Sequence, residues 1–503
     1  MKKAVFILFP ALFVCLCFLM ISCGGSDGGD NGNLTDSADN PGDFGGIDEN
    51  AGDVPAKIVK LEPDLPEADF GGAVINFLVK GEAHHWYWCS KEIYAEQENG
   101  EPVNDAVYKR NRYLEGRYNF EITEYRSSNP QSDAQKAVRA DDPVYDVFMI
   151  GLNTGAEFAQ NGYLTNLNSV PNINLSQPWW DQRAVSELSF GDKLYYALGD
   201  INTMDNDATF ATFFNKKLIA DHAMANPYEL VRGNEWTLDK FNEMIIEISR
   251  DINEDGAMDG NDLFGQLSEY YCSYALFVAA GGRITRNNPD NYPELAIGGE
   301  KTSSVIDKIL VNMGNRGVTL CADDYTGTYV NPWDELTRPM FKSNQGLFYT
   351  IGMGSCREFR DMEADYGILP LPKSDNNQKD YYHFVGTGSC TSVCIPVTNA
   401  NPERTGHILE AMAAESMYTL TEAYYTINFE NKQLRDEDSI EMTKIILKSR
   451  SYDIGEIFNF GDFVNMFGNM AKKNQNTFVS EYEKKETSAQ KQIDKLTETF
   501  NNG

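Results

Sequence analysis

The chain has 503 residues and a formal net charge of −32, with 42% apolar and 12% aromatic residues. The sequence has no basic stripe to set against this excess of acidic groups, which excludes nucleic acid and anionic lipid headgroups as partners, because phosphate binding needs clustered cations. The apolar content is that of a folded protein, and the length exceeds what one hydrophobic core usually holds, so we expect two lobes.

An apolar segment opens the chain and ends at Cys23. It starts with Lys2 and Lys3 and has the small residue Ser22 before the cysteine, which is the layout of a secretory signal. With a cysteine at the break it resembles a bacterial lipoprotein signal. The resemblance implies that residues 1–22 are removed, that Cys23 carries lipid, and that the protein works on the outer face of the cytoplasmic membrane. An uncleaved anchor is the alternative, although the run contains Pro10 and is slightly short of the roughly 20 apolar residues that a span needs.

Residues 23–60 are mostly glycine, aspartate, asparagine and serine up to about residue 53. Such a composition buries too little apolar surface to offset the entropy of the chain, so it predicts a flexible tether. The folded body should begin near residue 61.

Strands and helices alternate along the first part of the body. We expect strands at 73–79, 120–125, 144–150, 193–198, 346–354 and 366–371, and helices at 105–118, at 236–250 and over most of 403–500. The run 144–150 is apolar throughout, which is typical of a buried parallel strand. In the helix 236–250 the apolar side chains form one stripe, and Thr237 can cap its first turn. This alternation predicts an α/β architecture.

Six cysteines lie in the body. Their spacing is irregular, and the five histidines of the chain do not bracket them as zinc ligands would. Buried thiols are the expectation, and one or two disulfides stay open because an exported protein permits them.

Six short motifs resemble those of family 1 extracellular solute-binding proteins, the maltose-binding-protein-like lipoproteins of ABC importers. In chain order they are 145–148 (YDVF), 159–164 (AQNGYL), 191–197 (GDKLYYA), 214–218 (FNKKL), 236–241 (WTLDKF) and 366–372 (YGILPLP). They occur in the order typical of the family, and the resemblance covers roughly residues 70–500.

The resemblance implies an α/β, two-lobe periplasmic-binding-protein-like fold with an interlobe ligand cleft and a hinge. Each lobe would be built from two separate segments. We assign residues 61–204 and 346–396 to lobe I, and 205–345 and 397–503 to lobe II. It also implies a monomeric protein that captures a carbohydrate or oligosaccharide and delivers it to ABC permease subunits without acting as an enzyme.

Residues 251–262 (DINEDGAMDGND) have the spacing of an EF-hand calcium loop. Oxygen side chains stand at loop positions 1, 3, 5, 9 and 12, glycine stands at position 6, and the residue at position 7 offers its carbonyl. The predicted ligands are Asp251, Asn253, Asp255, Ala257, Asp259 and Asp262. We expect a structural calcium ion here, and a solvated acidic turn is the alternative.

Ligands of open α/β lobes bind beyond the carboxyl ends of the strands. Sugars present flat C–H faces and hydroxyl groups, so aromatic platforms with a few orienting polar groups suit them. The candidates that follow predicted strands or lie near the crossing between the lobes are Trp86, Trp88, Asn153, Trp179, Trp180, Asp205, Met353 and Arg357. For each tryptophan, packing in the core is the alternative.

Two other functions are weighed against transport. The sequence has no nucleophile elbow, no HExxH and no phosphate-binding loop, which argues against common enzyme chemistries. With 75 acidic residues, a pair of carboxylates for glycoside hydrolysis carries no information. A surface glycan-binding or sensory protein without a transporter would share the same fold.

Overall fold

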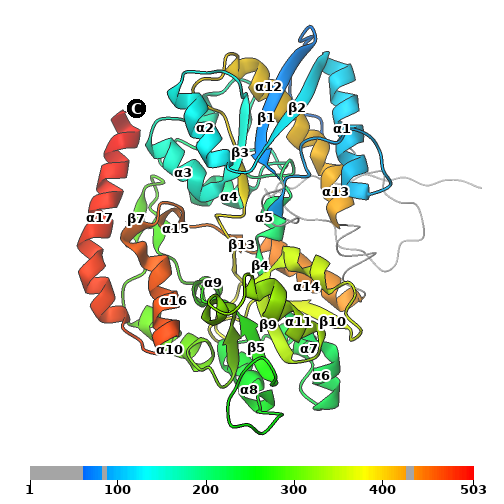
Figure 1. Ribbon diagram of the computed structural model, residues 1–503. Helices are drawn as coiled ribbons and strands as arrows, with labels where there is room; N and C mark the ends of the chain where they lie inside the picture. Colours follow the sequence, from blue (N-terminus) through cyan, green and yellow to red (C-terminus); the bar gives the residue numbers. More distant parts are fainter. Residues whose placement is uncertain (1–59, 82–87, 426–435, 503) are drawn as a thin grey trace, which may run out of the picture. The chain divides into compact units, whose positions relative to one another are not determined.

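Two separate sheets organise the computed structural model, which describes residues 60–81, 88–425 and 436–502. We call the part built on the four-stranded sheet lobe I and the part built on the five-stranded sheet lobe II (Figure 1). Both belong to one compact unit, residues 54–503.

The sheet of lobe I has the strand order β12-β3-β1-β2. Its strands are β1 (Ala73–Lys80), β2 (Phe120–Ser127), β3 (Val147–Gly151) and β12 (Thr391–Cys394). β1 pairs in parallel with β2 and β3, whereas β12 is antiparallel to β3. All five residues of β3 are buried, as the apolar run predicts.

The sheet of lobe II has the order β10-β4-β9-β5-β8. Its strands are β4 (Phe210–Asn215), β5 (Phe264–Ser268), β8 (Thr319–Cys321), β9 (Gly346–Gly352) and β10 (Tyr366–Leu369). β9 is the central strand and pairs with β4 and β5. Two small ribbons complete the strands, β6 (Thr285–Asn287) with β7 (Pro293–Leu295) and β11 (His383–Phe384) with β13 (Arg450–Ser451).

Helices cover both sheets, and their ends follow local sequence signals. Lobe I carries α1 (Pro102–Tyr118), α2 (Pro130–Arg139), α3 (Leu152–Gln160), α4 (Gln182–Leu188), α12 (Pro402–Met417) and α13 (Leu420–Tyr425). Around lobe II lie α6 (Lys216–Asp221), α7 (Pro227–Arg232), α8 (Leu238–Ile248), α11 (Arg338–Lys342) and α14 (Glu437–Lys448). The predicted cap of α8 is confirmed, because Thr237 accepts a hydrogen bond from the amide of Lys240.

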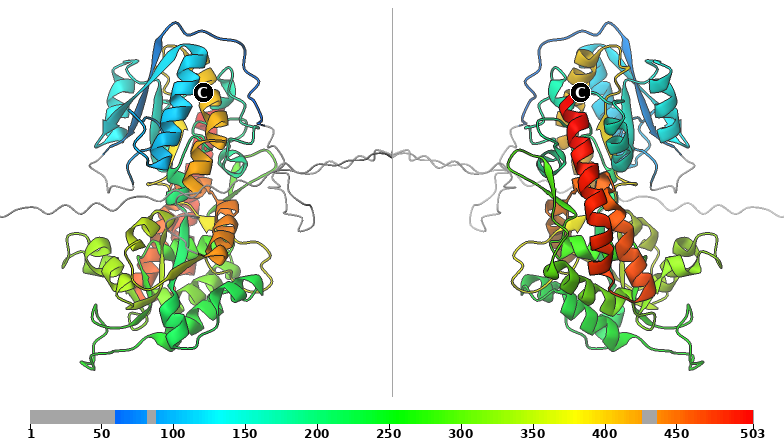
Figure 2. Two further views of the ribbon diagram at one scale, coloured as in Figure 1. Left: turned by 90° about the vertical axis from the view of Figure 1, so that its right-hand side faces the viewer. Right: turned by 90° about the vertical axis from the view of Figure 1, so that its left-hand side faces the viewer.

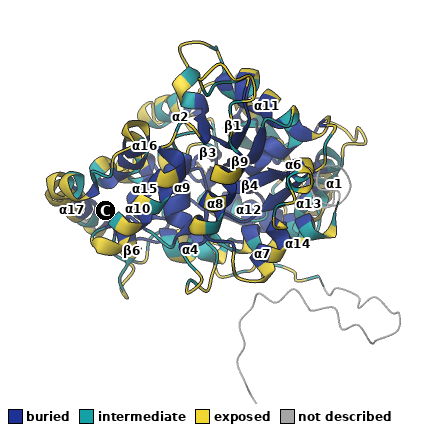
Figure 3. Ribbon diagram, turned by 90° about the horizontal axis from the view of Figure 1, so that it is seen from below, coloured by how far each residue is buried: buried dark blue, intermediate teal, exposed yellow. Residues whose placement is uncertain are grey.

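A further group of helices lies beside both sheets. It consists of α9 (Cys272–Ala279), α10 (Glu300–Met313), α15 (Ile454–Ile457), α16 (Phe463–Lys473) and α17 (Phe478–Asn502). α17 runs along one side and contacts α3 in lobe I as well as α10 (Figure 2). One hydrophobic core joins the sheet of lobe I to this group, and a second core lies around the sheet of lobe II. Figure 3 shows the strands buried and the outer turns of the surrounding helices exposed.

The division of the chain between the lobes differs from the expected one. We expected residues 346–396 in lobe I, but β9 and β10 belong to the sheet of lobe II and only β12 returns to lobe I. We also expected 397–503 in lobe II, whereas α12 and α13 pack against α1. These assignments depend on strand pairing between segments that are far apart in the chain. The local sequence pattern does not reveal that pairing.

The expected strand at 193–198 is also wrong. The segment makes only isolated bridges, Phe190 with Lys193 and Ala197 with Val393. Its end is held by a close approach of backbones at Gly199, where a Cβ would come within 2.3 Å of the carbonyl oxygen of Trp179. The segment is therefore a packed loop, and its apolar residues fill the core of lobe I.

Candidate functional site

A cavity of about 570 Å³ opens between the strand ends of the two lobes. Its walls come from residues that follow β1 and β3 in lobe I, from residues that follow β5 and β9 in lobe II, and from the segments 386–389 and 456–465. Carboxyl ends of strands are where α/β proteins place ligands, and the volume lies within the range of small-molecule sites.

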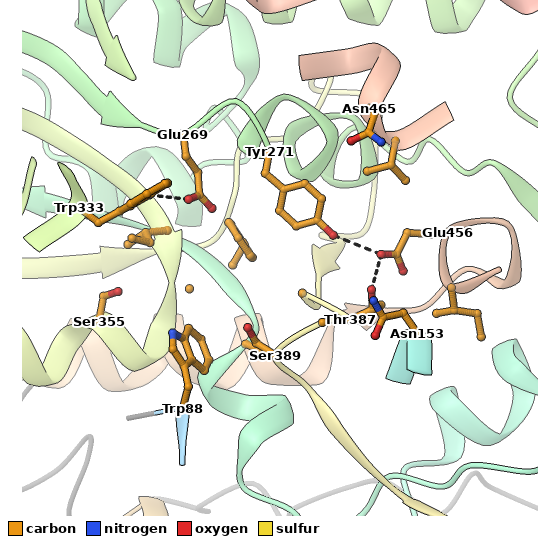
Figure 4. A pocket seen from close by; sticks show the side chains of 18 of the residues that line it. Trp88, Asn153, Glu269, Tyr271, Trp333, Ser355, Thr387, Ser389, Glu456 and Asn465 are labelled. Carbon is orange, nitrogen blue, oxygen red and sulfur yellow. Dashed lines mark hydrogen bonds between the residues drawn. The ribbon is translucent and has the colours of Figure 1, made fainter. Parts of the chain in front are cut away.

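Aromatic side chains enter this cavity from both lobes. Trp88 comes from lobe I, and Tyr271 and Trp333 come from lobe II (Figure 4). Trp333 starts a π-helical turn, Trp333–Thr337, that runs directly into α11. Such a widened turn is often found at functional sites. The three rings are half-buried, so each keeps part of its surface open to the cavity.

Glu269 holds the indole of Trp333 in place. The Nε1 of Trp333 donates a hydrogen bond of 2.6 Å to Oε2 of Glu269, which directly follows β5. Burial raises the pKa of the Glu269 carboxyl to about 7, and the charge of Asp323 acts in the same direction. The site therefore holds a carboxyl group that takes up a proton near neutral pH.

Glu456 is the second carboxyl group in the cavity. Its Oε1 accepts hydrogen bonds from Oγ1 of Thr387 at 2.6 Å and from the hydroxyl of Tyr271 at 3.2 Å. Burial raises the pKa of Glu456 to about 8, and the nearby Asp453 adds to this shift. Through these two hydrogen bonds Glu456 joins its own segment to those of Thr387 and Tyr271 at the cavity wall (Figure 4).

Amide and hydroxyl groups complete the lining. Beside the residues already named, the cavity is lined by the polar residues Asn331, Arg338, Ser355, Ser389, Asn459 and Asn465. Together with the aromatic rings they form a partly apolar, partly hydrogen-bonding surface that fits a polyhydroxylated molecule.

The predicted ligand residues divide into three groups. Trp88 and Asn153 line the cavity, as expected from their positions after β1 and β3. Met353 does not line it and is 1% exposed. Asp205 and Arg357 do not line it either, because each is held in a buried ion pair.

Those ion pairs surround α5 (Met204–Asp207), which connects the lobes. Arg450 lies 2.5 Å from Asp205, and Arg357 lies 2.8 Å from Asp207. The charges that we expected to face a ligand therefore hold the crossing segment instead.

Trp179 and Trp180 are structural. Each is 1% exposed, and both indole nitrogens donate to the carboxylate of Glu410 on α12, at 3.1 and 2.9 Å. An enclosed ring has no free face for a sugar, so the expectation that they bind ligand is wrong and their packing alternative holds. Trp86 lies outside the described residues.

The sequence reasoning missed Glu269, Tyr271, Trp333 and Glu456. A signal existed for the first two, since they follow the buried strand β5, which we had not predicted. Trp333 stands in a loop-like stretch after Pro332 and has no periodic pattern. Glu456 lies in a four-residue helix whose placement depends on distant contacts.

The acidic loop 251–262 makes its own hydrogen-bond network. Asp251 accepts from the amides of Glu254 and Gly256 at 2.7 and 2.8 Å, and Asp262 accepts from Ile252 and Asp259. Strand β5 follows where an EF-hand would have its second helix. Among the described residues no group of three or more acidic, histidine or cysteine side chains is arranged to hold a metal ion. The calcium site stays a prediction from sequence spacing.

The remaining predictions about the chain ends and cysteines have different outcomes. Residues 1–22, Cys23 and nearly all of the tether lie outside the described residues. In the part of the chain that the structure describes, no helix is long and apolar enough to cross a membrane. All six body cysteines are buried, and Cys272, Cys321, Cys390 and Cys394 are free thiols.

Several solved structures resemble this chain in fold. An ABC substrate-binding protein from Listeria monocytogenes in complex with cycloalternan matches with a TM-score of 0.53 at 13% identity, over 86% of this chain and 99% of that one. A cyclo/maltodextrin-binding protein complexed with maltotetraose gives 0.52 at 13% identity, over 86% and 97%. UspC of M. tuberculosis gives 0.51 at 12% identity, over 83% and 99%.

Sequence comparisons add nothing to these likenesses: no family model matches the chain, and no curated protein matches it. At such low identity the structural likeness concerns the fold. The chain has the two-lobed α/β fold of maltodextrin-binding ABC substrate-binding proteins.

Proposed function

We propose that the protein captures a carbohydrate between its two lobes and passes it unchanged to an ABC importer. The observation that carries this proposal is the cavity between the strand ends, with Trp88 on one side and Trp333 and Tyr271 on the other. Two of the similar structures are complexes with cycloalternan and with maltotetraose, which supports a sugar as the ligand here.

The chemistry of the lining suits a sugar ring. An indole can stack on the C–H face of a pyranose, while amides and carboxylates exchange hydrogen bonds with its hydroxyl groups. Glu269 and Glu456 both offer acceptor oxygens, and Asn153, Asn331 and Asn465 offer donors as well as acceptors.

Closure of the lobes around the ligand would complete the site. Because rings enter from both lobes, a rotation about the crossing segments would bring Trp88 and Trp333 onto the same sugar. The closed form would be what the permease subunits recognise, and the protein would act as a monomer. Two similar structures are named as binding proteins, which favours capture over conversion.

The proposal extends to the location of the protein. Lipidation at Cys23 would hold it at the outer face of the cytoplasmic membrane, and residues 23–60 would act as a flexible tether between the lipid and the body. Calcium in the loop 251–262 would stabilise lobe II without taking part in sugar binding.

The direct test is a binding screen with the purified body, residues 54–503. Melting temperature is measured against neutral and acidic mono-, di- and trisaccharides, with a peptide panel as control, and each hit is confirmed by calorimetry. A specific sugar should raise the melting temperature, because a ligand that binds only the folded state stabilises it by mass action. Binding of peptides without any sugar, or release of a shortened sugar during incubation, would contradict the proposal.

A further inference from the structure

A second cavity of about 560 Å³ adjoins the first one in lobe I. The two share Trp88, Asn153, Gly388 and Ser389 in their walls, so a bound chain could extend from one into the other past the indole of Trp88. Lys80, the last residue of β1, is among the residues that line the second cavity.

The two cavities differ in charge. The first contains the carboxyl groups of Glu269 and Glu456, with Arg338 as the cation among its lining residues. The second contains Lys80 and, among the described residues, has no acidic side chain in its wall.

Lys80 is buried, and no acidic side chain that the structure describes forms an ion pair with it. Its side chain belongs to a residue that is 8% exposed, and its ammonium group makes one hydrogen bond, 2.9 Å to the carbonyl oxygen of Gly388. Burial lowers the pKa of Lys80, and Cys390 and Glu92 offset this only in part. An ammonium group has three donors, so two remain for a ligand.

Two helices begin at this cavity. Pro130 and Gln131 of α2 and Asn153 and Thr154 of α3 line it. The N-terminus of a helix carries partial positive charge, but the side chain of Asn129 caps α2, and the amides of Leu152 and Thr154 donate to the carbonyl oxygen of Cys390 and to Oδ1 of Asn153. The buried cation and the absence of acidic side chains among the described lining residues therefore carry the positive character of this space.

We propose that the ligand is an acidic oligosaccharide, with its anionic group bound at Lys80 in the second cavity and a neutral ring held by the tryptophans in the first. This inference rests on the proposed sugar-binding function and names the substrate class. The anionic group is a uronate carboxylate or a sulfate ester, which share the chemistry that Lys80 recognises. Arg338, the cation of the first cavity, is already paired with Asp334, so Lys80 determines the end at which the anionic group lies.

The experiment compares acidic trisaccharides with matched neutral ones by calorimetry. Trigalacturonic acid is set against its methyl ester, and sulfated maltotriose against maltotriose. We expect one acidic member to bind about tenfold to a hundredfold more tightly than its neutral counterpart, as a charge-assisted hydrogen bond contributes. Which pair shows the preference distinguishes the carboxylate from the sulfate.

Variants then assign the preference to Lys80. Lys80→Met should remove it, Lys80→Arg should retain part of it, and Lys109→Met, an exposed change on α1, should leave it intact. A preference that survives in Lys80→Met overturns the inference. If the unmodified protein binds both members of each pair equally, the inference of an acidic ligand is also overturned, and no variant is needed to show it. The sugar-binding proposal stands in that case. If no sugar binds, the proposed function fails and this inference fails with it.

Discussion

Arg357 donates from both terminal nitrogens to the two carboxylate oxygens of Asp207, at 2.8 Å each. The hydroxyl of Tyr424 on α13 donates to the same carboxylate at 2.5 Å. These three residues tie the crossing helix α5 to lobe II on one side and to a helix of lobe I on the other. The ion pair of Arg357 with Asp207 lies at the crossing between the lobes and outside the cavity lining. We therefore expect it to contribute to stability.

Arg357→Met should destabilise the protein by about 3–5 kcal/mol, because it leaves the carboxylate of Asp207 buried without its cation. Urea unfolding measures the loss. Arg232→Met is the matched control: Arg232 contacts three acidic residues, but these pairs are exposed and screened by solvent, so this variant should lose much less stability. Equal losses in the two variants would contradict the assigned role of the buried pair.

Trp333→Ala and Trp179→Ala should have opposite effects. Removing the half-buried ring of Trp333 should weaken sugar binding by about 2 kcal/mol, roughly thirtyfold, with a small change in stability. Removing the enclosed ring of Trp179 should lower stability by about 3–5 kcal/mol and leave affinity unchanged. Calorimetry and thermal unfolding on both variants separate the two roles. Loss of affinity in Trp179→Ala alone would place the ligand elsewhere.

Stability without ligand should fall as pH rises from about 4.5 to about 8. The folded pKa of Glu456 is raised to about 8, so the folded state binds more protons than the unfolded state across this window. Each pKa unit corresponds to about 1.4 kcal/mol, so the loss reaches a few kcal/mol. Glu269 and Glu410, both raised to about 7, act in the same direction.

Glu456→Gln should therefore make this decline shallower and raise stability at pH 8. Urea unfolding at a series of pH values is the measurement. An unchanged slope in the variant would mean that Glu456 is ionised at neutral pH in the folded protein.

Calcium should raise the melting temperature of the body if the loop 251–262 binds the ion. The double variant Asp251→Ala with Asp255→Ala should lose the increase, because it removes two of the predicted ligands. Glu254→Gln is the control, since it removes a charge from the same loop at a position that does not face the ion. Absence of any shift at millimolar calcium would leave a hydrogen-bonded acidic turn.

Cys23→Ala should leave the precursor unprocessed or release the body from the membrane. Without the thiol there is no atom for the lipid to be attached to, and one or more acyl chains supply the anchoring energy. Membrane fractionation with metabolic labelling by a fatty acid checks both effects. A variant that matures and stays on the membrane as before would show that the apolar run anchors the protein by itself.

The sequence predicts strands better than it predicts their partners. β1, β3, β9 and β10 appear where apolar runs are bounded by glycine or polar residues, and β2 appears where apolar and polar residues alternate. Their grouping into sheets does not follow from such runs, because pairing is decided between segments far apart in the chain. The residues of β9 predict a strand but do not indicate a lobe. Only the pairing of β9 with β4 and β5 places it in lobe II.

The candidate site could be predicted only where it follows a recognised strand. Trp88 and Asn153 follow β1 and β3, which the sequence predicts, and both line the cavity. Trp180 looked equally suitable, but its environment depends on Glu410, which lies 230 residues away in the chain. The burial of a side chain depends on the whole fold. Residue type and local position therefore cannot tell whether a tryptophan stacks on a ligand or packs in the hydrophobic core.

The strands of the two sheets come from different parts of the chain, so the two sheets are completed at different points of synthesis. All five strands of the lobe II sheet lie between residues 210 and 369, whereas the lobe I sheet receives β12 only at residues 391–394. Ser392 of β12 bonds to Ile150 of β3 across a separation of 242 residues. A chain that emerges N-terminus first therefore exposes the apolar edge of β3 during most of its release. Until β12 arrives, that edge is the place where a neighbouring chain can pair wrongly.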